Sequence, residues 1–183
     1  MLLINNIDID VLIFTQQLHN IFLDELFWQI SKSYIFIPLW LWALYVIIKT
    51  YPLKNFLWIV LALGLGITAS DQCSNLFKYQ VKRLRPTHEA TLKQDIHLVH
   101  QYEGGKYGFY SAHASNSALI AFMAIILLKK NRWKYIFVLY SLLIGFSRIY
   151  IAAHYFTDVL FGWLMGIAIA FIIWRLFKSK ITS

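Results

Sequence analysis

Long apolar stretches alternate with short polar breaks along most of this chain. The stretches without a charged residue cover residues 34–48, 55–70, 114–128, 135–147 and 159–174. Each is shorter than the ~20 residues that an upright membrane helix needs, so we expect the helices to continue into the polar residues that flank them. The pattern predicts five transmembrane helices with polar side chains at their ends.

The N-terminal part of the chain has a different pattern. Between residues 8 and 29, apolar side chains recur near a helical period, with amide and charged side chains between them. The adjacent carboxylates Asp24 and Glu25 would be costly in the middle of a membrane. We therefore expect one amphipathic helix that lies in the membrane interface. The predicted fold is all-α: one membrane-embedded domain over residues 1–183, with an interfacial helix in 1–33 and a five-helix transmembrane core in 34–177.

Composition supports a membrane protein. Hydrophobic residues make up 59% of the chain and charged residues 14%, with a mean hydropathy of +0.57. A soluble domain carries about 25% charged residues, so these values exclude disorder and argue against a soluble enzyme. The net charge of +8 is interpreted as a basic face against anionic lipid, and no nucleic-acid partner is expected. Cys73 is the only cysteine, which excludes an internal disulfide.

The distribution of basic residues predicts an orientation. Residues 49–54, 129–134 and the tail after 174 hold nine basic residues and no acidic one, and alternating helices would place all three on one side. The other side carries every carboxylate and a long loop over about residues 77–112. We expect the basic segments to face the cytoplasm and the long loop to face outward.

Three polar clusters lie on the predicted outer side, and the first contains four positive charges. It runs from Lys78 to Pro86 and also includes Lys82, Arg83 and Arg85. Lys78 and Arg85 are seven residues apart, about two helical turns, so on one helix both would point the same way before Pro86 ends it. An ammonium and a planar guanidinium aimed together suit a phosphate. The alternative is a simple anchor to lipid headgroups.

The second cluster, Tyr110-Ser111-Ala112-His113, directly precedes an apolar stretch. Ser111 is a natural helix N-cap, and capping alone would account for it. The start of a helix also offers free N–H groups and a positive dipole end to an anion. His113 would then be placed to exchange protons with a bound group.

The third cluster contains Ser147, Arg148, His154 and Asp158 and connects two apolar stretches. His154 and Asp158 are four residues apart, so on one helix the carboxylate could reach an imidazole nitrogen. That contact would fix the tautomer and leave the other nitrogen free to attack. Alternatively, Arg148 extends to the headgroups and His154 is an ordinary interfacial histidine.

Together the three clusters resemble the three-part motif of the type-2 phosphatidic acid phosphatase superfamily, K-x6-R-P, P-S-G-H and S-R-x5-H-x3-D. The resemblance covers about residues 56–177. Tyr110 and Ala112 depart from the second part, where the family has proline and glycine, and Phe156 stands where many relatives have proline. These departures affect the shape of the phosphate cradle and the choice of substrate. They remove no charge and no proton carrier. The matching positions are Lys78-x6-Arg85-Pro86, Tyr110-Ser111-Ala112-His113 and Ser147-Arg148-x5-His154-x3-Asp158.

The resemblance implies a role for each matching residue. His154 would be the nucleophile that forms a phosphohistidine, Asp158 would orient it, and His113 would protonate the leaving oxygen and later activate water. No metal or other cofactor is implied, since fixed cations would stabilise the transferred group. The phosphate-binding residues that it implies are Lys78, Arg85, Ser111, Ala112 and Arg148.

The implied function is hydrolysis of a phosphomonoester or diphosphate on a membrane lipid. Candidate substrates are undecaprenyl diphosphate, phosphatidylglycerophosphate, phosphatidic acid and lipid A, and the only other expected partner is the bilayer. The implied location is a bacterial inner membrane, with the site facing the periplasm or the exterior. A non-catalytic lipid-phosphate binder or transporter with the same basic pocket is the alternative.

The outer loop holds further polar residues. For its histidines, ordinary solvation is favoured over a metal site. Its glycine- and aromatic-rich part, from Tyr102 to Tyr110, predicts a flap over the site. The histidines and carboxylates of this loop are His88, Glu89, Asp95, His97, His100 and Glu103.

Overall fold

The structure, a computed structural model, describes residues 6–128 and 131–182, and within them it contains helices and no β-strand. The α-helices are connected by short turns and by one long loop, between α4 and α5. The predicted all-α class is confirmed. The helices are α1 (Asn6–Gln17), α2 (Ile21–Ser31), α3 (Ile37–Thr50), α4 (Leu53–Val81), α5 (Ala112–Leu127), α6 (Ile136–Tyr150) and α7 (Phe156–Thr182), with short 3-10 helices η1 (Tyr34–Phe36), η2 (Pro86–His88), η3 (Val99–Gln101) and η4 (Arg132–Tyr135).

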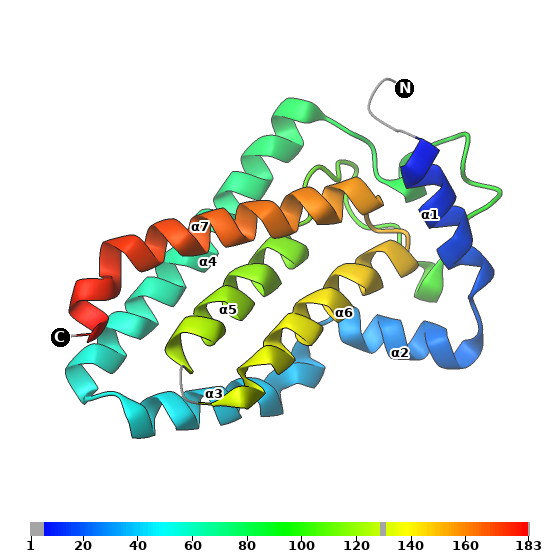
Figure 1. Ribbon diagram of the computed structural model, residues 1–183. Coiled ribbons are helices and arrows are strands. Elements are labelled where there is room, and N and C mark those ends of the chain that lie inside the picture. The colour runs from blue at the N-terminus through cyan, green and yellow to red at the C-terminus, as the bar shows by residue number, and fades with distance from the viewer. Residues whose placement is uncertain (1–5, 129–130, 183) are drawn as a thin grey trace.

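Helix α5 packs against α4, α6 and α7 (Figure 1). Its closest approach is to α7, because Gly162 and Gly166 have no side chain there. A Cβ atom on Gly162 would collide with the backbone oxygen of Ser111, and one on Gly166 with that of Ser115. The four-residue spacing of these glycines thus produces the close helix contact that such spacing favours in membranes.

The predicted number of membrane spans is confirmed only in part. Helices α4 and α7 are long and apolar enough to cross a membrane, and α2 with the η1–α3 segment would form a third span that is bent by 72°. Helix α5 is apolar but only 16 residues long. The structure therefore supports an integral membrane protein with two or three clear spans, and the count of five stays a prediction.

The N-terminal segment is two helices, which corrects the prediction of one helix over residues 8–29. Helix α1 ends at Gln17, and the Asn20 side chain starts α2 by accepting a hydrogen bond from the backbone N–H of Leu23 at 3.0 Å. Helix α1 packs against α6 and α7 and buries Asp8 and Leu12. It is therefore part of the bundle and does more than cover the membrane interface.

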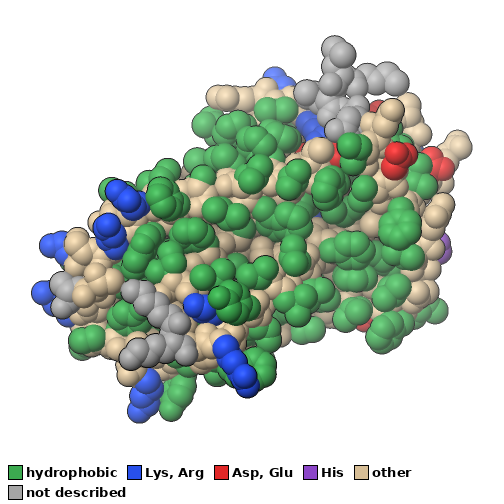
Figure 2. Space-filling view, viewed as in Figure 1, with side chains coloured by type: hydrophobic (Ala, Val, Ile, Leu, Met, Phe, Trp, Pro, Cys, Tyr) green, Lys and Arg blue, Asp and Glu red, His purple; other side chains and the backbone are tan. Residues whose placement is uncertain are grey.

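The two ends of the bundle differ in charge. Figure 2 shows most of the visible Lys and Arg at the end that carries the C-terminus, whereas the visible Asp and Glu lie toward the opposite end, near α1 and α2, together with a few Lys and Arg. Hydrophobic side chains cover the visible face between the two ends. Lys129 and Lys130, which contribute to the predicted basic side, lie outside the described residues.

Candidate active site

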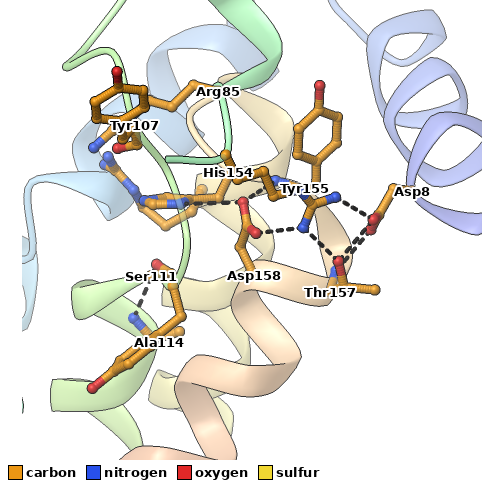
Figure 3. A network of polar contacts seen from close by, with 12 residues as sticks. Asp8, Arg85, Tyr107, Ser111, Ala114, His154, Tyr155, Thr157 and Asp158 are labelled. Carbon is orange, nitrogen blue, oxygen red and sulfur yellow. Dashed lines mark hydrogen bonds and ion pairs between the residues drawn. The ribbon is translucent and has the colours of Figure 1, made fainter. Parts of the chain in front are cut away.

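The three sequence clusters meet at the end of the bundle that carries α1 and α2. The backbone N–H of Ser111, at the start of α5, donates to the backbone oxygen of Asp158 in α7 at 3.1 Å. On the other side, the Ser74 hydroxyl of α4 donates to the backbone oxygen of Tyr110 at 2.9 Å. Figure 3 shows the resulting arrangement, with Arg85, His154 and Asp158 converging above the start of α5.

Arg85 does not lie on the same helix as Lys78, which corrects the geometric argument from their spacing. Helix α4 ends at Val81 because Lys82 takes a left-handed conformation (φ 52°), and Arg85 has extended backbone dihedrals. The chain turns back, and the Arg85 backbone N–H donates to the Lys106 backbone oxygen at 3.1 Å. The predicted convergence nevertheless exists, since Lys78 interacts electrostatically with Arg85 and Arg148.

Ser111 caps α5 as predicted: its hydroxyl accepts from the Ala114 backbone N–H at 3.4 Å. Ala112 is the first residue of that helix and is not among the residues with a positive φ. A glycine is therefore not needed there for backbone conformation. His113 follows and interacts electrostatically with Arg148 and His154, so the proton carrier expected from sequence lies near these two site residues.

His154 lies in the loop between α6 and α7, and Asp158 lies in the first turn of α7, so the two are not on one helix as expected. They are still neighbours, with 3.7 Å between His154 Nδ1 and Asp158 Oδ2. This distance is longer than a hydrogen bond. Because Nδ1 faces the carboxylate, Nε2 is the ring nitrogen that is left for a substrate.

The outer loop reaches this pair, as the predicted flap requires. A Cβ atom placed on Gly108 would lie 3.3 Å from Asp158 Oδ2 and 3.6 Å from His154 Nδ1. It would also lie 3.1 Å from Arg85 Cγ, which is closer than ordinary contact. The absence of a side chain at residue 108 thus lets the loop backbone approach the site.

The surroundings of His154 favour its neutral form. The side chain is 2% exposed. Burial is the main cause that moves the pKa of His154 well below its ordinary value of 6.5, and the positive charges of Arg85 and Arg148 add to the shift. The imidazole therefore keeps a free lone pair at neutral pH, which is the form that can act as a nucleophile.

Asp158 has closer partners than His154, and sequence reasoning missed them. Its Oδ1 accepts from Arg83 Nη1 at 2.5 Å, and its Oδ2 accepts from the Tyr155 backbone N–H at 3.1 Å. The other end of the Arg83 guanidinium forms an ion pair with Asp8 of α1 at 2.5 Å. Arg83 thus joins two buried carboxylates.

Asp8 also holds the start of α7 (Figure 3). Its carboxylate accepts from the Thr157 backbone N–H at 2.8 Å and from the Thr157 hydroxyl at 2.7 Å. Asp8 therefore serves as an N-terminal cap supplied by another helix. No sequence pattern pointed to Asp8, which lies outside the residues covered by the family resemblance.

Tyr102 is the other functional candidate that sequence reasoning did not single out, beyond its place in the flap. Its phenol oxygen accepts from Arg148 Nη2 at 3.2 Å and from Arg85 Nη1 at 3.4 Å. Burial alone would raise the pKa of this phenol, but the two arginines outweigh burial and lower it. An oxygen atom thus already occupies a point between the two cations where a phosphate oxygen would fit.

Comparison with known proteins identifies the family of this chain. The PAP2 superfamily matches residues 55–181. Among curated proteins, a lipid A 4'-phosphatase of Bacteroides thetaiotaomicron is 33% identical over 166 residues, which are 89% of this chain and 73% of that protein. A lipid A 4'-phosphatase of Porphyromonas gingivalis is 29% identical over 156 residues, 85% of this chain and 66% of that protein.

Solved structures share the fold. A PAP2-type phosphatidylglycerolphosphate phosphatase of Bacillus subtilis has a TM-score of 0.68 at 22% identity, over 95% of this chain and 85% of that chain. LpxE of Aquifex aeolicus has a TM-score of 0.65 at 24% identity, over 91% of this chain and 94% of that chain. The family match covers more than half of the sequence and confirms the predicted resemblance and enzyme class: the chain belongs to the PAP2 superfamily.

Proposed function

We propose that this protein is a membrane lipid phosphatase that removes a phosphate group from lipid A or a similar phosphorylated lipid by way of a phosphohistidine. The observation that carries the proposal is the pair of buried arginines beside His154. Arg85 and Arg148 are 9% and 5% exposed, and within the described residues neither forms an ion pair with a carboxylate. A buried cation without a negatively charged partner is costly, so this place is prepared for an anion.

The first step uses the free nitrogen of His154. Its Nε2 attacks the phosphorus atom, an N–P bond forms and the P–O bond to the lipid breaks. The electron pair stays on the leaving oxygen, which takes a proton from His113. His113 enters this step protonated, because the negative charge of the bound phosphate offsets the burial and the neighbouring cations that otherwise favour its neutral form. Arg85 and Arg148 stabilise the charge on the remaining phosphoryl oxygens, which is the usual main contribution in phosphoryl transfer.

The second step regenerates the enzyme. His113, now neutral, takes a proton from a water molecule that attacks the phosphorus atom, and the N–P bond breaks to release inorganic phosphate. Lys78 adds a third cation, and the Ser111 hydroxyl with the N–H groups at the start of α5 completes the cradle. Ala112 contributes its backbone there. Neither step uses a metal ion, so we predict that the reaction is independent of metal.

Asp158 acts in this proposal as a positioning residue. It is fixed by Arg83 and by the Tyr155 backbone, so it presents a constant negative charge to the His154 Nδ1 side. That charge favours a proton on Nδ1 and so keeps the lone pair on Nε2. Because Asp8 of α1 holds the same Arg83, we propose that residues 1–183 form one domain, N-terminal helices included.

Lipid A is favoured among the four candidate lipids because two relatives are lipid A 4'-phosphatases. Undecaprenyl diphosphate, phosphatidylglycerophosphate and phosphatidic acid present the same phosphate chemistry to the site. The test is inorganic phosphate release from each of the four lipids by the purified protein in detergent with EDTA. We expect the fastest release from lipid A and none of it to depend on added metal.

The matched variants are H154A and H88A. H154A removes the nucleophile and should lower phosphate release by at least about 10³-fold. H88A removes a loop histidine that interacts with its neighbour Thr87, and should keep wild-type activity. Equal phosphate release by wild type and H154A would contradict the assignment of His154 as the nucleophile. If the wild-type protein binds these lipids but releases phosphate from none of them, the alternative of a non-catalytic lipid-phosphate binder is favoured.

The covalent intermediate has its own test. Turnover of a ³²P-labelled substrate, quenched in denaturant at alkaline pH, should leave acid-labile label on His154, because phosphohistidine is stable to base and labile to acid. Label on another residue, or none in an active enzyme, would indicate direct attack by water.

We also propose that the site faces the periplasm or exterior of a bacterial inner membrane. The cluster of Lys and Arg at the C-terminal end of the bundle supports this orientation. The transporter alternative is disfavoured because the buried charged side chains of the described chain all lie at the site end. In intact cells, with C73S as background, K106C should react with an impermeant maleimide and K178C should not; the reverse would invert the orientation.

A further inference from the structure

We propose that His19, Asp24 and His97 form a binding site for a divalent transition metal ion, with Zn²⁺ as the best fit. His19 lies in the turn between α1 and α2, Asp24 in the first turn of α2 and His97 in the outer loop before η3. One ligand atom from each lies within 4.8 Å of the other two. The inference does not depend on the phosphatase proposal.

The distances and the donor types suit zinc. Zn²⁺ binds imidazole nitrogen and carboxylate oxygen at about 2.0–2.2 Å in tetrahedral geometry, which places ligand atoms roughly 3.3 Å apart. His97 Nε2 and Asp24 Oδ2 are 2.8 Å apart, and the His19 and His97 rings are stacked with centroids 4.4 Å apart. An imidazole binds a metal in the plane of its ring, so the exposed His19 ring would rotate out of this stack to share one ion with His97 and Asp24. Three protein ligands would leave a fourth position for water.

The carboxylate is held in the orientation that such a site needs. The buried Tyr150 hydroxyl donates to Asp24 Oδ1 at 2.7 Å, so Oδ2 is the oxygen turned toward His97. Metal-binding carboxylates and histidines are commonly fixed in this way by outer hydrogen bonds. Asp24 therefore has the support expected of a ligand.

The loop that carries His97 is fixed at the same place. The His97 backbone N–H donates to the side-chain oxygen of Gln16 at 2.9 Å, and the Gln16 amide donates to the Tyr150 backbone oxygen at 3.0 Å. Gln16 is buried in α1. Two ligands from different parts of the chain are thus tied to one buried tyrosine, and little movement would be needed on binding.

A neighbouring pair provides an internal comparison. His100 and Glu25 also lie side by side, with 3.0 Å between Nε2 and Oε2, and both are about half exposed. This pair has one imidazole, one carboxylate and no third ligand within the described residues. It represents the ordinary exposed ion pair, which contributes little to stability. His100 is therefore the matched control for His19 and His97.

A metal ion here would connect the outer loop to the N-terminal helices. Tyr102, which accepts from the two site arginines, follows His97 by five residues, and Tyr150 follows Arg148 by two. Binding would therefore stabilise the flap and α1–α2 against local opening. The bound ion would have a structural role and would take no part in the phosphate chemistry at His154.

The test is zinc binding by purified protein in detergent, without a polyhistidine tag and after stripping with EDTA. Competition with a chromophoric chelator should give one Zn²⁺ per chain with a dissociation constant of about 10 µM or tighter. H19A and H97A should each weaken binding at least about 100-fold, Y150F about tenfold, and H100A less than about twofold.

Two further measurements keep the result interpretable. Co²⁺ in place of Zn²⁺ should give the visible absorption of a tetrahedral site in wild type and H100A, and not in H97A. The Tm of each metal-free variant shows whether it folds like wild type, since Zn²⁺ should raise the Tm only where the site is intact. No binding by wild type, unchanged binding by H19A, or loss of binding only in H154A would overturn the proposal.

Discussion

Three buried arginines lie at the same end of this protein, in two different settings. In the paired cluster (Asp8, Arg83, Thr157 and Asp158), the guanidinium of Arg83 forms ion pairs with two carboxylates. In the open cluster (Arg85, Tyr102 and Arg148), the only described side-chain acceptor is the phenol oxygen of Tyr102. All three arginines are less than a tenth exposed, so the difference lies in their partners and not in burial.

This difference separates a structural role from a functional one. Removing either partner of a buried ion pair leaves an uncompensated charge and destabilises the fold. A buried cation without an anion already lowers the stability of the fold, and binding of an anion removes that cost. We therefore expect changes in the paired cluster to be measured mainly as lost folding stability. Changes in the open cluster should be measured mainly as lost activity. The predictions below test this division.

The largest effect is expected for R83M. It removes the cation between Asp8 and Asp158 and leaves two buried carboxylates without it, which should lower the free energy of unfolding by about 3–5 kcal/mol. Denaturant titration in detergent measures this. The exposed R175M should stay within about 0.5 kcal/mol of wild type. A change in R83M as small as in R175M would show that the paired cluster does not hold the fold.

R148M should have the opposite profile. Without this guanidinium the transferred phosphoryl group loses a charge contact, and kcat/KM should fall about 10²–10³-fold. The free energy of unfolding should stay the same or rise, because a buried cation without a carboxylate has been replaced by an apolar side chain. Steady-state kinetics and the same denaturant titration give both values. A large loss of stability in R148M would place Arg148 among the structural residues.

D8N should have an intermediate effect on stability. The amide keeps an oxygen for the start of α7 but loses the charge that faces Arg83, while Asp158 still pairs with that arginine. We expect a loss of about 1–3 kcal/mol in the free energy of unfolding and a smaller loss of kcat/KM. D10N changes a neighbouring carboxylate and serves as the control. A double-mutant cycle of D8N with R83M should show strong coupling.

Y102F should have the smallest effect at neutral pH, about a tenfold or smaller loss in kcat/KM, since one neutral oxygen that positions two arginines is removed. Its pH dependence is more informative. Arg148 and Arg85 lower the pKa of the Tyr102 phenol despite its burial, so the phenolate appears at a lower pH than for a free tyrosine. The phenolate would compete with phosphate for the arginines, so wild-type activity should fall on the alkaline side. In Y102F that alkaline limb should move to higher pH.

An unchanged alkaline limb in Y102F would mean that another group causes it, and that Tyr102 only packs against its neighbours. Y107F provides the comparison for a tyrosine of the same loop. The phenol of Tyr107 forms no hydrogen bond to Arg85 in the structure; its backbone oxygen does, and that oxygen is kept in Y107F. Y107F should therefore have the wild-type pH profile.

Local patterns predicted which polar residues would lie together at one end of the bundle. Seven polar residues were expected at helix ends, and the structure brings them together: Lys78, Arg85, Ser111, His113, Arg148, His154 and Asp158. The spacing argument was less reliable in detail. Arg85 reaches the site through a turn at Lys82, and His154 lies outside the helix of Asp158, because helix ends depend on single residues that a regular period does not reveal.

The sequence alone determined the solvent, the helical class and the chemical groups of this protein. Composition fixes the need for a bilayer, and fixed spacings within short segments identify the motif residues. Only the tertiary structure decided which groups are paired. Arg83 meets Asp158 across 75 positions and Asp8 meets Thr157 across 149, and such contacts depend on how whole helices pack and leave no periodic pattern in the sequence. Helix packing likewise brings His97 beside His19 and Asp24, although His97 is more than 70 residues away from both in the sequence.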